Sequence, residues 1–214
     1  MKLVAINVSK KIRDKNILSN INLELESGKV YGFVGYNGSG KTMLFRALSG
    51  LMSIDSGSVE WNHKLLHKDF AVLPNLGIMI ENAGLYPDLT GMENLVYLAK
   101  MNGKIGVEEI RNTMIRVGLN PDDKRTYNKY SLGMKQRLVI AQALMEKPDV
   151  IMLDEPTNAL DDKGVDEIRK VILQEKERGA LILLASHNKE DIRILTDYLY
   201  RIENGNISLQ EESM

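Results

Sequence analysis

The sequence predicts an α/β fold with a parallel β-sheet at its core, an antiparallel β part at its N-terminus and an inserted α-helical subdomain. Three observations lead to this prediction. In the last third, the apolar runs Val150–Leu153 and Leu181–Ala185 alternate with helical patterns, which is typical of parallel strands covered on both faces. The first third alternates apolar and polar residues with the period of two of half-buried strands. From Thr90 to Leu144, apolar residues recur at helical spacing.

The elements follow in order along the chain. The period-two pattern, the apolar runs and the turn residues between them predict strands at Leu3–Val8, Ile21–Leu25, Val30–Val34 and Ser58–Trp61. A helix is expected to start at Lys41 and to end at Gly50, because glycine readily adopts the backbone conformation that closes a helix.

The middle and the end of the chain complete the prediction. Helices are expected within Thr90–Leu119 and from Ser131 to Leu144 or Met145. The last third adds two helices and two short strands, at Asp166–Leu173, Lys189–Leu195, Leu199–Ile202 and Ile207–Leu209. We therefore expect a single domain over residues 1–214, with an α/β core of about 1–80 and 148–214 and a helical subdomain at 81–147.

The amino-acid composition excludes several classes of site and makes others unexpected. The 214 residues carry 28 Lys and Arg against 29 Asp and Glu, so the formal net charge is −1 and a broad nucleic-acid surface is not expected. No cysteine is present, which excludes disulfides, zinc–thiolate sites and cysteine nucleophiles. A membrane span needs about 20 mostly apolar residues, and the longest clean apolar run, Ala180 to Ala185, is far shorter.

A glycine-rich segment after the strand Val30–Val34 carries the strongest local signal. It matches G-x-x-x-x-G-K-T and reads Gly35, Tyr36, Asn37, Gly38, Ser39, Gly40, Lys41, Thr42. Glycines let consecutive backbone N–H groups turn toward phosphate oxygens, and the following helix N-terminus favours negative charge. Lys41 is expected to reach the β- and γ-phosphates and the Thr42 hydroxyl to bind Mg²⁺. The pattern indicates a P-loop NTPase core.

A second acidic motif ends the strand Val150–Leu153. Asp154 and Glu155 follow it directly, at the carboxyl edge of the sheet where the glycine-rich segment also lies. We expect Asp154 to hold Mg²⁺, directly or through water, and Glu155 to act as the general base for the attacking water.

A third segment indicates which class of P-loop nucleotidase the sequence resembles. Residues 130–138 read YSLGMKQRL, which resembles the L-S-G-G-Q-x-Q-R signature of the ATP-binding subunits of ABC transporters. Asn158–Asp161 resembles the family's D-loop, Ser186–His187 its switch histidine, and Tyr86–Thr90 the segment after its glutamine loop. The order of these motifs matches over nearly the whole chain.

This resemblance implies further site residues. His187 would contact the γ-phosphate and orient the base, while Ser131 and Gly133 would offer a hydroxyl and an N–H to the γ-phosphate of a partner subunit. Ile12 stands where the family places an aromatic residue on adenine, and the neighbouring Arg13 is an alternative. Glu81 stands at the glutamine-loop position that ligates Mg²⁺, with Asn75 nearby as an alternative. The signature itself departs from the family at Leu132 and Met134.

The resemblance implies a function and partners. The chain would bind and hydrolyse ATP with Mg²⁺ and drive transport through separate transmembrane permease subunits, at the cytoplasmic face of the membrane. Two ATP-binding subunits, expected to be identical, would close head-to-tail around ATP, and no nucleic-acid partner is expected. The departures resemble the bacitracin and lantibiotic export or self-protection branch. Two alternatives are a regulatory or degenerate cassette with little turnover, and an ABC-type ATPase that acts on DNA or ribosomes.

Overall fold

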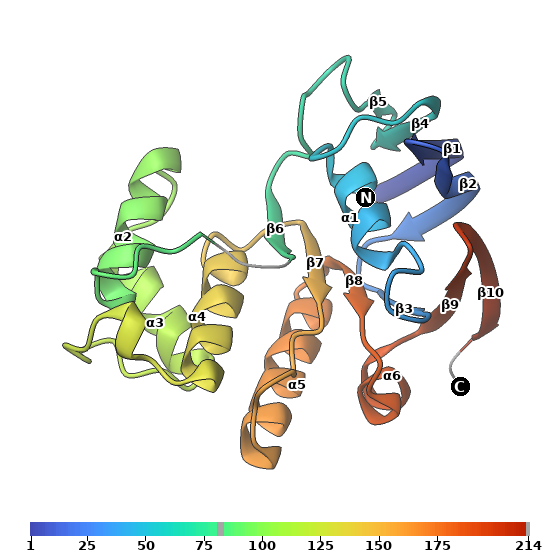
Figure 1. Cartoon of the computed structure of the whole chain (residues 1–214). Helices are drawn as coiled ribbons and strands as arrows, with labels where there is room; N and C mark the ends of the chain where they lie inside the picture. Colours follow the sequence, from blue (N-terminus) through green and yellow to red (C-terminus); the bar gives the residue numbers. More distant parts are fainter. Residues whose placement is uncertain (81–83, 213–214) are drawn as a thin grey trace.

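Two β-sheets and six α-helices build the described part of the chain, which in the computed structural model comprises residues 1–80 and 84–212 (Figure 1). The larger sheet has the strand order β10-β9-β3-β8-β7-β6. Its strands are β3 (Val30–Val34), β6 (Leu76–Met79), β7 (Val150–Asp154), β8 (Leu181–Ala185), β9 (Tyr198–Glu203) and β10 (Asn206–Glu212). All neighbouring strands pair in parallel except β9 and β10. The predicted parallel sheet is confirmed.

The smaller sheet is antiparallel and comes mainly from the N-terminal part of the chain, as predicted. Its order is β2-β1-β4-β5, and its strands are β1 (Lys2–Ile12), β2 (Lys15–Glu26), β4 (Ser56–Trp61) and β5 (Lys64–Leu65). The register pairs Leu3 with Leu25 and with Trp61, which places these apolar side chains on one face. β1 and β2 extend beyond their predicted ranges, and the predicted strands did not include β5 or β6.

The helices begin and end at residues whose chemistry explains their bounds. They are α1 (Lys41–Ser49), α2 (Gly91–Asn102), α3 (Val107–Arg116), α4 (Leu132–Leu144), α5 (Asp162–Glu177) and α6 (Lys189–Leu195), with a short 3₁₀ turn, η1, at Tyr127–Lys129. Thr90 and Glu93 form a capping box at the start of α2. The side chain of Asp161 accepts a hydrogen bond from the Gly164 backbone N–H, so α5 begins four residues before its predicted start.

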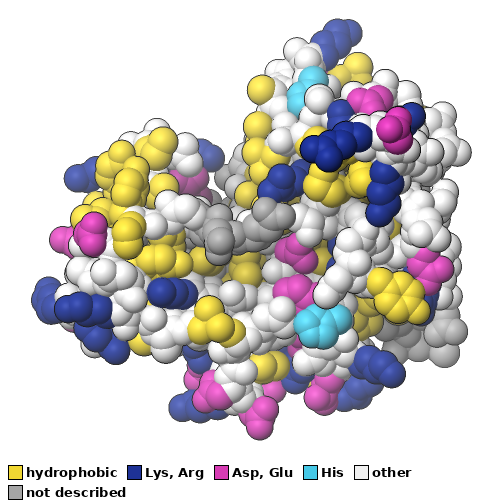
Figure 2. Space-filling view, in the orientation of Figure 1, with side chains coloured by type: hydrophobic (Ala, Val, Ile, Leu, Met, Phe, Trp, Pro, Cys, Tyr) yellow, Lys and Arg dark blue, Asp and Glu magenta, His cyan; other side chains and the backbone are white. Residues whose placement is uncertain are grey.

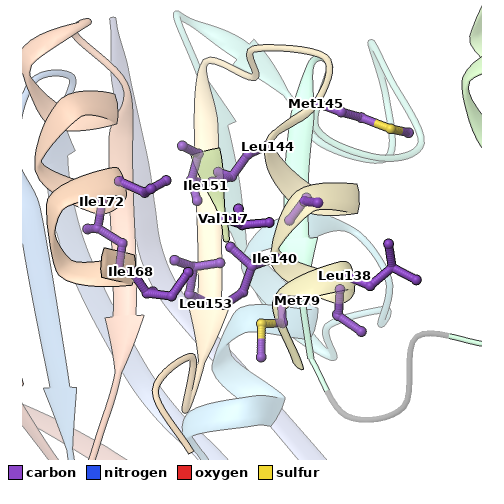
Figure 3. Packing of buried hydrophobic residues seen from close by; sticks show 14 of the residues in the cluster. Met79, Val117, Leu138, Ile140, Leu144, Met145, Ile151, Leu153, Ile168 and Ile172 are labelled. Atoms are coloured by element: carbon purple, nitrogen blue, oxygen red, sulfur yellow. The ribbon is translucent and has the colours of Figure 1, made fainter. Parts of the chain in front are cut away.

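Two apolar cores cover the two faces of the larger sheet. Val150 and Met152 of β7 face α1 and the antiparallel sheet, whereas Ile151 and Leu153 face the opposite core with α4 and α5. Figure 3 shows side chains from α4 and α5 meeting Ile151 and Leu153. This alternation explains why the strand is apolar at every position.

Helices α2 and α3 lie at one end of the molecule, away from the antiparallel sheet (Figure 1). They are joined to the larger sheet through α4, which packs on β6 where Gly77 leaves room. A Cβ at Gly77 would come within 2.0 Å of the Ala143 carbonyl oxygen. The boundaries of the helical subdomain at 81–147 stay a prediction. Among the described residues, no helix combines the length and the apolar composition needed to cross a bilayer.

Candidate functional site

The glycine-rich loop of residues 35–40 connects β3 to α1. Gly40 precedes α1 with φ of 112°, a left-handed conformation that glycine adopts without strain, and within the described part of the chain no side chain caps the helix start. A Cβ on Gly40 would meet the Ile17 carbonyl oxygen at 3.0 Å, so this position is also sterically restricted. Ser39 Oγ is buried and makes no hydrogen bond within the described residues. The loop therefore leaves polar groups at a helix N-terminus, the arrangement that binds anions.

The Lys41 side chain lies across this loop. Its Nζ donates hydrogen bonds to the carbonyl oxygens of Gly35 at 2.7 Å and Tyr36 at 3.3 Å, and the residue is only 8% exposed. An ammonium group held against the loop supplies a positive charge beside the helix N-terminus. Together they form a site for a phosphate group.

Thr42 and Asp154 meet although 112 positions separate them. The Thr42 hydroxyl donates to Asp154 Oδ2 at 2.5 Å. Strand β7 lies next to β8, which lies next to β3, so the carboxyl end of β7 comes close to the start of α1. A hydroxyl and a carboxylate oxygen beside a phosphate site are the hard ligands that Mg²⁺ prefers, and these two residues fit that ion.

Glu155 and His187 form a second pair at the same sheet edge. Glu155 Oε2 lies 2.8 Å from His187 Nδ1 and accepts the His187 backbone N–H at 3.3 Å. Glu155 adopts a left-handed backbone with φ of 54°, which is uncommon for a residue with a side chain. Its backbone N–H donates to the Ala185 carbonyl oxygen at 2.8 Å, which holds the unusual conformation in place. The carboxylate is 21% exposed and the imidazole 67% exposed, so water can reach both groups.

Seven of the predicted residues line one open pocket of about 550 Å³. Its lining comprises Ile17, Asn37, Gly38, Gly40, Lys41, Thr42, Met43, Asp154 and Glu155. Gly35, Tyr36 and His187 line a neighbouring pocket of about 440 Å³ at the end of β3 and β8. Tyr36 is strongly exposed there. The glycine-rich loop, the candidate metal ligands and the candidate base thus share one surface.

Other predicted residues lie elsewhere. Ile12 is half-exposed at the end of β1 and is not among the residues that line the main pocket; Ile17 of β2 is. Ser131 caps α4 by accepting the Met134 backbone N–H at 3.2 Å. A Cβ on Gly133 would meet the Ala159 carbonyl oxygen at 3.0 Å, so the start of α4 lies against the segment after Glu155. Glu81 falls outside the described residues.

The structure adds residues that the motifs did not single out. Ile17 and Met43 give the main pocket an apolar wall. The Gln136 amide donates from Nε2 to the carbonyl oxygens of Glu155 at 2.9 Å and Pro156 at 3.1 Å. Gln136 belongs to the signature-like segment, but only the tertiary structure reveals its partners. Burial raises the pKa of Tyr130, which packs beside Gly91 at the start of α2.

Comparison with known proteins decides the family. A family model described as ABC transporter matches residues 18–158. The chain is 45% identical over 207 residues to the uncharacterized ABC transporter ATP-binding protein YybJ of Bacillus subtilis, covering 97% of this chain and 95% of that protein. The chain belongs to the ABC transporter ATP-binding family. The cassette is also 37% identical over 211 residues to the lantibiotic transport ATP-binding protein SrtF of Streptococcus pyogenes, covering 96% and 89% of the two chains.

A further relative supports the family assignment, and a solved structure shows the fold. The bacitracin transport ATP-binding protein BcrA of Bacillus licheniformis is 36% identical to this cassette over 203 residues, covering 94% of this chain and 66% of that protein. Among solved structures, the dimeric ABC transporter cassette MJ0796 superposes with a TM-score of 0.88 at 22% identity, covering 99% of each chain. The predicted family is confirmed, and the fold is that of ABC cassettes.

Proposed function

We propose that this cassette hydrolyses ATP and thereby powers transport through separate permease subunits. The observation that carries the proposal is one pocket in which the phosphate loop and the Thr42–Asp154 pair lie next to Glu155, which contacts His187. Such a pocket holds a phosphate chain, a metal and an ordered water within reach of a carboxylate, and this is what phosphoryl transfer to water requires. Family membership in the ABC cassettes supports the same chemistry.

The chain's own residues would divide the binding work as follows. Backbone N–H groups of the loop and the α1 N-terminus face the phosphate oxygens, and Lys41 Nζ exchanges its carbonyl partners for phosphate oxygens. The Thr42 hydroxyl and the Asp154 carboxylate hold Mg²⁺. When bound, Mg²⁺ neutralises charge that develops on the phosphate oxygens.

Glu155 would then act on water. Its carboxylate ends a strand at the pocket wall and accepts a proton from the attacking water. His187 Nδ1, at 2.8 Å from Glu155 Oε2, fixes the direction in which that carboxylate points. Loss of this contact would displace the Glu155 carboxylate relative to the phosphate, and such a displacement lowers the rate of hydrolysis.

A second cassette would complete the site. Ser131 and Gly133 lie at the exposed start of α4, outside the pocket that Lys41 and Thr42 line. Leu132 between them is 70% exposed. An exposed apolar residue beside an exposed hydroxyl suits a surface that another chain covers, so we infer that these residues face the ATP bound by a second copy.

The permease partner would contact the helical end of the molecule. Tyr86, Tyr97 and Met101 are each about half or more exposed there, and the two tyrosine rings pack edge to face with centroids 5.1 Å apart. Figure 2 shows hydrophobic side chains gathered on this part of the surface. Aromatic residues and methionine are enriched in protein interfaces, which supports docking of a separate membrane subunit on the cytoplasmic side.

The relatives' names indicate the class of cargo. SrtF is named for lantibiotic transport and BcrA for bacitracin transport. We infer that this cassette serves export of, or protection against, a peptide antibiotic of that kind. Co-purification from membranes followed by identification of the bound chains tests the permease partner.

Phosphate release from Mg²⁺-ATP tests hydrolysis. The wild-type chain should release phosphate, and faster when reconstituted with its permease. Asp154→Asn should lose this activity because a metal ligand is gone. The matched control is Asp149→Asn, immediately before strand β7, which should behave as wild type. Wild-type turnover in Asp154→Asn would contradict the proposed metal site.

A further inference from the structure

One buried carboxylate connects the two segments that carry Glu155 and His187. Asp191, in the first turn of α6, is completely buried. Its Oδ2 accepts the Thr157 hydroxyl at 2.5 Å and the Ser186 hydroxyl at 3.4 Å. Thr157 comes two residues after Glu155, and Ser186 comes immediately before His187. The same oxygen therefore binds both loops.

The charge of Asp191 is balanced by Arg169 of α5. Arg169 is 8% exposed, and its Nε and Nη2 lie 2.8 Å and 2.7 Å from Asp191 Oδ1. Both guanidinium nitrogens contact the same carboxylate oxygen, and charge-assisted hydrogen bonds of this kind are stronger than neutral ones. With Oδ1 held by Arg169, Oδ2 stands at a defined place between the two loops. Asp191, Arg169 and Thr157 are not among the residues that line the main pocket.

We propose that Asp191 is a positioning residue that sets the contact between Glu155 and His187, and that Thr157 transmits this constraint to Glu155. The inference rests on the proposed function, because it assigns the cluster to the hydrolysis step. It follows from the geometry. The Thr157 and Ser186 hydroxyls both bond Asp191 Oδ2, and the segments that contain them carry Glu155 and His187, which contact each other at 2.8 Å.

Thr157→Val is the most informative substitution. Valine has nearly the shape of threonine and removes only the hydroxyl, while Asp191 keeps Arg169 and Ser186 as partners. The buried charge thus stays compensated, which replacement of Arg169 would not allow. Thr157→Ser restores the hydroxyl without the methyl group. Thr113→Val is the matched control, since Thr113 is equally buried but its hydroxyl bonds the Glu109 carbonyl oxygen within α3.

The kinetic experiment measures Mg²⁺-ATP hydrolysis by the full chain. Thr157→Val should lower kcat about tenfold, since small displacements of catalytic groups cost this much or more, and should leave KM within about twofold of wild type. Thr157→Ser should recover most of kcat. In a His187→Ala background, Thr157→Val should cost much less, because the contact it positions is already gone. Equal kcat values for Thr157→Val and Thr113→Val would overturn the proposal.

A second measurement needs no turnover. The chain has three imidazoles, those of His63, His67 and His187, which histidine-selective NMR of the nucleotide-free chain can observe separately. All three are exposed, and within the described residues the His187 Nδ1 is the one that contacts a carboxylate. In the wild type, His187 should show the tautomer with the proton on Nδ1, which donates to Glu155. In Thr157→Val its signals should move toward those of His63 and His67, and in Thr113→Val they should not. Unmoved His187 signals in Thr157→Val would overturn the proposal. A wild type that fails to hydrolyse ATP would overturn the proposed function while this readout still decides the positioning.

Discussion

Substitution of Gln136 by glutamate tests the hydrogen bonds between α4 and the segment that carries the candidate base, Glu155. Gln136 Nε2 donates to the backbone carbonyl oxygens of both Glu155 and Pro156. A glutamate has nearly the same shape but at neutral pH offers only acceptors, so its carboxylate would face two carbonyl oxygens. Gln136→Met is the comparison that removes the donor without adding charge.

The magnitude follows from the two lost hydrogen bonds. At about 0.5–1.5 kcal/mol each, their loss in Gln136→Met should cost about 2 kcal/mol of unfolding free energy, or about 4–8 °C in Tm for a chain of this size. Gln136→Glu should cost more at pH 7, because a partly buried charge then has no donor.

Thermal unfolding at several pH values is the assay. Protonation gives the new carboxyl a donor, so its folded-state pKa should lie above the unfolded value of about 4.3. The stability that protonation provides is present below that unfolded pKa and is lost as the pH rises through the folded pKa. Each variant's loss of stability is measured against wild type at the same pH. At pH 7 this loss should be larger for Gln136→Glu than for Gln136→Met, and near pH 4 the two losses should become similar. Wild-type Tm in both variants at pH 7 would refute the reasoning.

Three further predictions concern separate parts of the molecule. Lys41→Ala should weaken binding of Mg²⁺-ATP in isothermal titration, because the positive charge at the phosphate loop is lost; wild-type affinity would place the phosphate site elsewhere. Burial raises the pKa of Tyr31 from about 10 to about 12, so stability present below pH 10 should be lost as the pH rises through 12. In urea unfolding, Tyr31→Phe should lose about 2–3 kcal/mol less unfolding free energy than wild type over this alkaline range. The same pH dependence in both proteins would contradict this prediction. Glu81→Ala should leave ATP binding largely intact and impair hydrolysis and its stimulation by the permease; wild-type activity in both Glu81→Ala and Glu81→Gln would show that Glu81 does not stand at the glutamine-loop position.

Local sequence patterns predict the sheet and the phosphate loop well, and the reason is physical. Strands that are apolar at nearly every position, such as β7 and β8, indicate a sheet that is covered on both faces. The spacing of glycines before Lys41 encodes a loop whose backbone must turn tightly in front of a helix. Strand order then brings Asp154 beside Thr42, which a motif alone does not guarantee.

The remaining features depend on contacts between distant parts of the chain. β6 has only four residues and includes Gly77, so its pattern is too short to indicate a strand. Ile17 lines the pocket because β2 passes Gly40, a contact that no periodicity encodes. Thr157 and Asp191 are 34 positions apart and look like an ordinary loop residue and an ordinary surface acid until the fold joins them. Buried polar clusters of this kind need tertiary structure to be recognised.

Glu155 is proposed to be the base with which this cassette hydrolyses ATP. Steady-state phosphate release by Glu155→Gln tests this role most directly, with Glu108→Gln, an exposed acid on α3, as the matched control. Loss of the base should lower turnover by about 10²-fold or more while ATP binding persists, and the ATP-bound variant should elute as a dimer. Glu108→Gln should match wild type. Unchanged turnover in Glu155→Gln would contradict the role of Glu155 as the base.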